Sequence, residues 1–325
     1  MKPVVIGFDT SCYTTSCAAA TVDGEIVISA RKLLPVPEGA RGLRQSEMVF
    51  IHTKQLPDRV REVAEAIGGA PVRAVCVSAR PRDDADSYMP AFHVGDAHAR
   101  SLAALLGVPV FFSTHQRGHI RAAMVDSGIR PGDLLAVHLS GGTTEILSLR
   151  GEELTLLGGS LDLHAGQLVD RTGVALGLGF PAGPALEKLA RQGQSRALLP
   201  VSMEKDGISC HLSGAESQVQ RWLRDGTLTP EDAAAEVYDL LARSVARMIT
   251  AAAAQTGIRQ VLLAGGVASS ALFRELVTRR IHSRDRGLRV CFGRPEYSGD
   301  NAAGIALIGA DRLRQMNETT NDREE

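Results

Sequence analysis

The sequence lacks a large excess of either charge. Its 36 Lys and Arg residues nearly balance 37 Asp and Glu residues, so the formal net charge is −1 with His neutral. A protein that holds nucleic acid through its overall charge usually carries a strongly basic footprint. The composition excludes that class, and any contact with RNA requires a local basic patch or a partner protein.

Cysteine pairs and long apolar runs are also missing. The cysteines are scattered and form no CxxC pair: Cys12, Cys17, Cys76, Cys210 and Cys291. This argues against a disulfide framework or a zinc ribbon and predicts free thiols in a reducing compartment. No apolar run approaches the roughly 18 residues that cross a bilayer, and no signal-peptide pattern precedes VVIGFD. We therefore expect a cytoplasmic protein with no membrane partner.

The composition that is present is that of an ordinary globular protein, with 44% hydrophobic and 22% charged residues over 325 positions. This length suits two lobes of about 150 residues each better than a single core. The polar end of the chain, from Gln315 onward, is expected to fray.

One arrangement of predicted strands occurs twice. Each copy has three apolar runs joined by two turns; the runs are residues 4–9, 17–22 and 25–34 in the first copy, and 134–139, 144–149 and 154–157 in the second. In the first copy, Asp23-Gly24 is a hairpin signal. Two such units, each opening about half of the protein, indicate an internal duplication.

Helices are predicted in the intervals between these strands. They cover residues 96–106, the segment from the cap Thr229 to Gly257, the residues after Gly265-Gly266, and residues 302–310. A further strand, residues 261–264, separates the second helix from the third. This alternation predicts mixed α/β lobes.

Two histidines four residues apart are the first candidates for chemistry. His115 and His119 lie on one face of a predicted helix, where both imidazoles can reach one ion. The alternative is a pair of ordinary surface histidines, and the metal interpretation requires a third ligand. A zincin helix is not indicated, because Gln116 stands where H-E-x-x-H has its general base.

Three small-residue segments follow or flank predicted strands. The turn at Asp9–Thr15 is rich in hydroxyls, and Ser140-Gly141-Gly142 offers backbone N–H groups to an anion. Gly265-Gly266 joins a strand to a helix N-terminus and lets a nucleotide lie against the backbone. Each segment could also be a plain turn, and Asp300, before the last helix, could be an N-cap.

The order of these elements discriminates better than any one of them. A hydroxyl-rich turn, an SGG turn, a Gly-Gly junction and a final small-residue helix are the successive phosphate, phosphate, adenosine and connecting elements of the two-lobed actin-like ATPase fold, an α/β fold with duplicated ribonuclease-H-like lobes. We assign residues 1–110 and 296–325 to the first lobe and residues 111–295 to the second.

In this order the motifs resemble those of the TsaD/Gcp family, the tRNA threonylcarbamoyl-adenosine synthases once described as glycoprotein endopeptidases. The similarity runs over nearly the whole chain. It is carried by Asp9-Thr10-Ser11-Cys12, His115 and His119, Ser140-Gly141-Gly142, Ala165-Gly166, Val169-Asp170-Arg171-Thr172, Pro181, Gly183-Pro184, Ala264-Gly265-Gly266-Val267 and Asp300-Asn301.

The resemblance implies a site and a reaction. One divalent metal, iron or zinc, would bind His115, His119 and Asp300, with coordination positions left for substrate. ATP or an acyl-adenylate would be held by Ser11, Ser140, Gly141, Gly142, Asp170, Gly183, Gly266 and Ser270, and Asp9 and Asp170 are the candidate catalytic carboxylates. The threonylcarbamoyl group would pass to an adenosine of tRNA, and proteins of the threonylcarbamoylation machinery are expected partners.

Several residues depart from the family pattern near the nucleotide and acyl site. Two acids after the cysteine are replaced by Tyr13 and Thr14, the histidine of Ser-Gly-Gly-His-Thr by Thr143, the Asn after the Gly-Gly junction by Ser270, and a Gly-Pro-Gly segment by residues 80–90. A divergent paralogue is therefore predicted. The alternative to a transferase is a non-catalytic paralogue that binds nucleotide and metal and regulates the true synthase. A metallopeptidase ranks lowest, and a sugar kinase would leave the metal triad unexplained.

Overall fold

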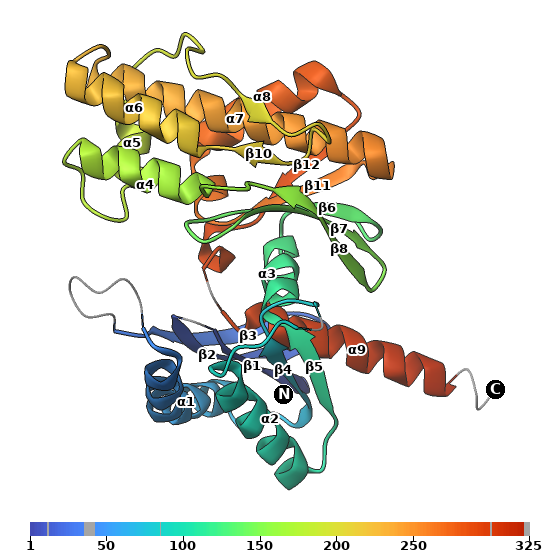
Figure 1. Cartoon of the computed structure of the whole chain (residues 1–325). Coiled ribbons are helices and arrows are strands. Elements are labelled where there is room, and N and C mark those ends of the chain that lie inside the picture. The colour runs from blue at the N-terminus through green and yellow to red at the C-terminus, as the bar shows by residue number, and fades with distance from the viewer. Residues whose placement is uncertain (12, 36–42, 85, 300, 322–325) are drawn as a thin grey trace. The chain divides into compact units, whose positions relative to one another are not determined.

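The computed structural model describes residues 1–11, 13–35, 43–84, 86–299 and 301–321 (Figure 1). The chain divides into two compact units, Met1–Ala122 with Gly299–Glu325, and Ala123–Ser298. These bounds differ from the lobes expected at 110/111 and 295/296. The first difference has a structural reason, because strand β5 (Val110–Thr114) pairs in parallel with β4 (Val72–Arg80) of the first sheet.

The first unit is built on a five-stranded sheet of order β3-β2-β1-β4-β5. Its first three strands are β1 (Val4–Thr10), β2 (Thr14–Thr21) and β3 (Ile26–Leu33), which pair antiparallel, whereas β4 pairs in parallel with β1. Every residue of β1 and β2 is buried. Central strands with such continuous burial are covered on both faces of the sheet.

Helices cover the two faces of this sheet. One face packs against α1 (Gln45–Ile67) and α2 (Phe92–Leu106), through Ile6 and Phe8 of β1. The other face packs against α9 (Ala303–Asn321), through Val5. Gly7 makes that second contact close, because a Cβ added there would lie 2.5 Å from the backbone nitrogen of Ala306.

The second unit repeats the same sheet topology. Its strands are β6 (Leu134–Leu139), β7 (Thr144–Arg150), β8 (Glu153–Gly159), β11 (Gln260–Ala264) and β12 (Arg289–Phe292), in the order β12-β11-β6-β7-β8. The first three pair antiparallel, and β11 pairs in parallel with both β6 and β12. The predicted duplication is thus present as two sheets with the same order of pairing.

The remaining helices of the chain are α3 (His115–Met124), which follows β5, and five helices of the second unit: α4 (Ala165–Ala175), α5 (Gly183–Ala190), α6 (Ser213–Asp225), α7 (Pro230–Thr256) and α8 (Ala271–Arg284). Strands β9 (Ser202–Met203) and β10 (Cys210–His211) form a small separate sheet, and short 3-10 segments cover Val267–Ser269 and Pro295–Tyr297. Helix α7 supplies much of the core of the second unit (Figure 1).

Local signals set several boundaries as predicted. The Thr229 side chain accepts a hydrogen bond from the Asp232 amide at the start of α7, and Gly257 ends that helix at φ 74°. Helix α2 ends at Gly107 as expected but begins at Phe92, four residues before the predicted start. The expected fraying from Gln315 is wrong as far as Asn321, because α9 continues to that residue.

No helix of the described residues is long and apolar enough to cross a membrane.

Candidate functional site

The two histidines predicted from sequence meet in the first unit. His115 is the first residue of α3, directly after β5, and His119 lies one turn later. Their Nε2 atoms are 2.9 Å apart, and their rings meet edge to face at 77° with centroids 4.4 Å apart. Both rings therefore direct the same nitrogen to one point.

A buried carboxylate holds the first of these rings. Nδ1 of His115 lies 3.0 and 3.1 Å from the two carboxylate oxygens of Asp9. The hydroxyl of Ser78, on neighbouring strand β4, donates to the same carboxylate, and the hydroxyl of Ser16 donates to the Asp9 carbonyl at 2.9 Å. Asp9 has no exposed surface. Its carboxylate is hydrogen-bonded to other residues of the protein and does not face solvent.

The donor set suits a transition-metal ion. Two nitrogens bonded to one ion at about 2.1 Å lie about 3.4 Å apart at the tetrahedral angle of zinc and about 3.0 Å apart at a right angle, so the Nε2 separation of 2.9 Å is nearer the second value. Imidazole suits zinc or iron, and a ligating His usually donates its other ring N–H to a carboxylate. No group of three such ligands occurs among the described residues. The predicted third ligand, Asp300, lies outside them, so the metal triad stays a prediction.

The start of α9 packs closely on the histidine helix. A Cβ added to Gly304 would lie 1.9 Å from the carbonyl oxygen of Gly118, which lies between the two histidines in sequence. The side chain of Asn301 accepts a hydrogen bond from the Ala303 amide at 3.0 Å and caps this helix. The alternative that Asp300 is an N-cap lies outside the described residues.

A histidine of helix α1 is hydrogen-bonded to the hydroxyl-rich turn of the first unit. His52 is fully buried, with Nε2 2.8 Å from the Ser11 carbonyl and Nδ1 2.8 Å from the Thr15 hydroxyl. Burial has the largest effect on His52 and lowers its pKa, although the Ser11 carbonyl and the charge of Asp9 act to raise it. Ser11, predicted to bind nucleotide, is itself only 2% exposed.

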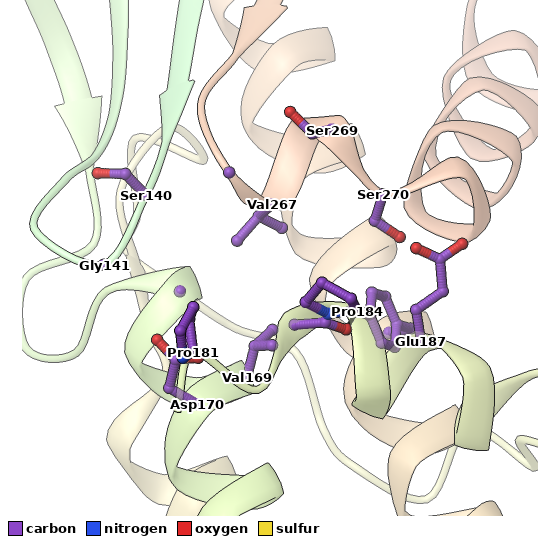
Figure 2. A pocket seen from close by; sticks show the side chains of 14 residues that line it. Ser140, Gly141, Val169, Asp170, Pro181, Pro184, Glu187, Val267, Ser269 and Ser270 are labelled. Carbon is purple, nitrogen blue, oxygen red and sulfur yellow. Dashed lines mark hydrogen bonds between the residues drawn. The ribbon is translucent and has the colours of Figure 1, made fainter. Parts of the chain in front are cut away.

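A separate pocket of about 410 Å³ lies within the second unit. Figure 2 shows that its walls come from the β6–β7 turn, helices α4 and α5, and the segment that joins β11 to α8. Six residues predicted to bind nucleotide line it: Ser140, Gly141, Asp170, Gly183, Gly266 and Ser270. The predicted Gly142 is not among the lining residues.

Sequence reasoning missed eight further lining residues: Gly166, Val169, Pro181, Pro184, Glu187, Tyr238, Val267 and Ser269. Most are neighbours of predicted residues within the same motifs, so a reading of whole motifs could have found them. Tyr238 is different, because it lies inside α7, where its apolar neighbours made it look like a core residue.

Glycines create the close approaches that shape this pocket. A Cβ at Gly265 (φ 99°) would lie 2.3 Å from the Leu139 carbonyl oxygen, and one at Gly166 would lie 2.5 Å from the Gly141 amide nitrogen. These glycines let the β11–α8 junction and the start of α4 press against the end of β6. Gly141 and Gly266 have no atom within 4 Å of such a Cβ, so their backbone faces open space.

The N-terminus of α8 is already occupied by the protein. The Ser270 hydroxyl accepts from the Phe273 amide at 3.1 Å, and Glu187 accepts from the Leu272 amide at 2.9 Å. Burial acts to raise the pKa of Glu187, but hydrogen bonds from Leu272, Ser270 and Arg191 outweigh it, and the pKa lies below its ordinary value. Figure 2 shows Ser270 and Glu187 facing each other. These two amides of the helix N-terminus are therefore already hydrogen-bonded to side chains of the protein.

The chemistry of the lining favours an uncharged, hydroxylated group. The lining residues include the carboxylates of Asp170 and Glu187, and none of the fourteen described is Lys, Arg or His. An ionised carboxylate only accepts hydrogen bonds, so it suits hydroxyl or amine donors. Tyr238 donates to the Gly183 carbonyl at 3.1 Å, and burial raises its pKa, so the phenol stays neutral. Apolar walls from Val169, Val267 and two prolines complete a pocket of nucleoside character.

Comparison with known proteins identifies the family. A family model described as tRNA N6-adenosine threonylcarbamoyltransferase matches residues 51–307, well over half of the chain. The chain belongs to this threonylcarbamoyltransferase family. A protein of that name from Aromatoleum aromaticum is 31% identical over 319 residues, which covers 94% of this chain and 90% of the relative. Another from Thermofilum pendens is 28% identical over 308 residues, with 94% and 88% covered.

Solved structures place this chain among actin-like ATPase folds. HypF from T. kodakarensis matches 97% of this chain with a TM-score of 0.63 and 15% identity, and this chain spans 48% of that one. The ROK hexokinase from Thermus thermophilus matches 96% of this chain and 99% of its own, with a TM-score of 0.55 and 15% identity. Identities this low establish the fold alone, and they confirm the predicted fold class.

The departures from the threonylcarbamoyltransferase pattern have definite places in the fold. Thr14 is the first residue of β2 and is 3% exposed, whereas Tyr13 is 41% exposed. The segment that replaces Gly-Pro-Gly is tied to the histidine helix, because Asp83 accepts from the guanidinium of Arg117 and from the hydroxyl of Thr114 at 2.9 Å. Of these departures, the segment with Asp83 contacts the histidine helix, and the histidine pair itself is retained.

Proposed function

We propose that this protein transfers a threonylcarbamoyl group from its adenylate to the exocyclic amine of an adenosine in tRNA. In this reaction a bond forms between the amine nitrogen and the carbamoyl carbon, the bond from that carbon to the adenylate oxygen breaks, AMP leaves, and the amine loses a proton. The observation that carries the proposal is the gathering of six predicted nucleotide-binding residues around one pocket, in a chain of this family.

In this proposal the pocket binds the adenosine part of the adenylate. One carboxylate oxygen of Asp170 accepts from the Ala182 amide at 2.8 Å, which fixes the side chain at the pocket wall. Its remaining acceptor capacity suits the ribose hydroxyls. The open backbone at Gly266 lets a base or ribose lie against the β11–α8 junction, and the Gly141 amide suits an anionic oxygen.

We further propose that His115, His119 and Asp300 hold one divalent ion, iron or zinc. Such an ion would supply Lewis-acid stabilisation of carbamoyl or phosphate oxygens. The close Nε2 pair and the carboxylate on His115 support the histidine part of this site. Neutral imidazoles are required for metal binding, and removal of either ring is expected to abolish it.

A local basic surface on the second unit is proposed to contact the tRNA backbone. Between Arg243 and Arg294 the chain carries ten Arg residues and only two acidic ones, Glu275 and Asp285, although the whole chain is nearly neutral. Many of these arginines are engaged within the protein. Three exposed ones, Arg247, Arg284 and Arg286, form no ion pair with the described residues and are available to phosphates.

The experiment is a transfer assay with purified protein, synthesised threonylcarbamoyl-adenylate and unmodified tRNA. Formation of threonylcarbamoyl-adenosine, detected by mass spectrometry of the digested tRNA, is the expected result. A protein that binds AMP but forms no product with any tRNA sample would overturn the transferase proposal.

A second candidate is a nucleotide-binding regulator of the true synthase. The observation that favours it is Thr14, a buried strand residue where the family has an acid. The two candidates give opposite results in cells depleted of the authentic enzyme. Restored tRNA modification by this chain supports the transferase, and absent modification together with binding to the authentic enzyme supports the regulator.

A further inference from the structure

We propose that Asp9 is a positioning residue for the histidine pair, and not a group that reacts with substrate. Its carboxylate accepts a hydrogen bond from Nδ1–H of His115 and thereby leaves Nε2 of that neutral ring unprotonated, ready for a divalent ion. This inference rests on the proposed metal site and assigns to Asp9 a role different from the catalytic one that the sequence suggested.

The contacts between Asp9 and the ring of His115 favour one tautomer. A carboxylate without a proton can only accept, so the 3.0 and 3.1 Å contacts between Asp9 and Nδ1 of His115 favour a proton on Nδ1. A neutral imidazole has one N–H, so Nε2 then carries the lone pair. That nitrogen is the one that lies 2.9 Å from Nε2 of His119. A metal ligand needs this tautomer at His115.

Because Asp9 is buried, its carboxylate can position His115 but cannot reach a substrate. Asp9 has no exposed surface, and Ser78 donates to the same oxygen that contacts His115. A general base must reach a proton on the substrate. The carboxylate is instead enclosed by its own strand, by Ser78 of β4 and by the ring of His115, so it has no path to a substrate proton.

The fold explains why residues 106 positions apart meet here. Strands β1, β4 and β5 are parallel, and the carboxyl ends of parallel strands share one edge of the sheet. Asp9 lies near the end of β1, and His115 immediately follows β5. This carboxylate–histidine arrangement is one that metalloproteins use to orient a ligand and raise its basicity, and its loss typically costs 10–100-fold in metal affinity.

The first measurement needs no metal, and it uses a variant only for assignment. In the full-length metal-free protein, nitrogen-15 NMR of the histidine side chains, assigned with the His115→Gln spectrum, is expected to show Nδ1 of His115 protonated and Nε2 unprotonated. A spectrum with the proton on Nε2 would overturn the inference. This readout tests the tautomer directly, and the zinc affinity of Asp9→Asn tests whether the contact with Asp9 matters for the metal.

The second measurement is zinc affinity, by competition with a chromophoric chelator. Asp9→Asn is expected to bind zinc 10–100-fold more weakly than the wild type, and Asp9→Glu is expected to recover part of the loss. Ser16→Ala is the matched control, because it removes a buried hydrogen bond to the Asp9 carbonyl and leaves the carboxylate in place; it is expected to bind like the wild type. Circular dichroism checks that each variant is folded.

The outcomes separate the two proposals. If the wild type binds zinc and Asp9→Asn binds it within twofold, the role of Asp9 is overturned and the metal site stands. If the wild type binds no zinc and no iron, the metal site itself fails, and the inference about Asp9 fails with it.

Discussion

Glu187 is a pocket carboxylate whose contacts serve the protein. It caps the start of α8 through the Leu272 amide and pairs with Arg191 at 2.9 Å. Asp170, on the opposite wall, accepts a hydrogen bond from the Ala182 amide with one of its carboxylate oxygens. The two acids look equivalent in sequence, yet their contacts give Glu187 a structural task and leave Asp170 with acceptor capacity for a ligand.

The pKa of Glu187 makes a pH-dependent prediction. Because its folded pKa lies below the ordinary value of 4.5, its stabilisation is complete above about pH 4.5 and is lost as pH falls through the folded pKa. Glu187→Gln should therefore be about 1–3 kcal/mol less stable than wild type at pH 7, and the gap should shrink toward pH 3. Urea unfolding at several pH values measures this. A gap that stays constant with pH would contradict the assignment.

Asp170 should affect ligand binding more than stability. Asp170→Ala is expected to weaken AMP binding at least tenfold, since ribose hydroxyls lose their acceptor and about 1.4 kcal/mol corresponds to tenfold. Titration calorimetry measures it. The exposed Asp225→Ala is the matched control and should bind AMP normally. Equal affinities in the two variants would remove Asp170 from the binding site.

At the scale of elements, close helix–sheet contacts fix the position of α9 on the first sheet. Gly7 is the critical point, since a Cβ there would overlap the backbone of Ala306. Backbone cannot rotate away as a flexible side chain can, so the helix must shift.

Gly7→Ala is therefore predicted to destabilise the protein by about 1–3 kcal/mol or more. Gly142→Ala, where an added Cβ meets no atom within 4 Å, is the control and should be near neutral. Chemical denaturation followed by circular dichroism compares them. A Gly7→Ala variant as stable as the control would contradict the packing of α9 on β1.

Strands and capped helices were the elements that sequence predicted best. Leu134–Leu139 matches β6 at both ends, and Thr229 and Gly257 bound α7 as their capping chemistry requires. Helix α1 was not predicted, since its polar residues and the internal Pro57 hide its apolar stripe. The contact between Asp9 and His115 could not be predicted either, because it depends on three parallel strands that bring distant residues to one edge.

At the scale of the whole molecule, charge is distributed unevenly along a nearly neutral chain. The ten arginines between Arg243 and Arg294 all lie in the second unit, with two on α7, four on α8, one on β12 and three in connecting segments. A near-zero net charge therefore conceals a basic segment that an overall count does not reveal.

Replacing Arg247, Arg284 and Arg286 with Gln is predicted to weaken tRNA binding about tenfold or more near 0.15 M salt and to reduce the slope of log K against log salt, because fewer counterions are released. A matched triple replacement at exposed arginines elsewhere, Arg61, Arg73 and Arg221, should leave both quantities nearly unchanged. Filter binding over a salt series measures them. Equal losses in both triples would show that the effect is not local to this surface.

The most direct test of the central claim combines metal content with transfer, on wild type and on His115→Ala/His119→Ala. We predict about one iron or zinc ion per wild-type chain and threonylcarbamoyl-adenosine in the tRNA. The double variant is expected to lose both the bound metal and the transfer activity. Transfer that persists in the metal-free double variant would contradict this prediction.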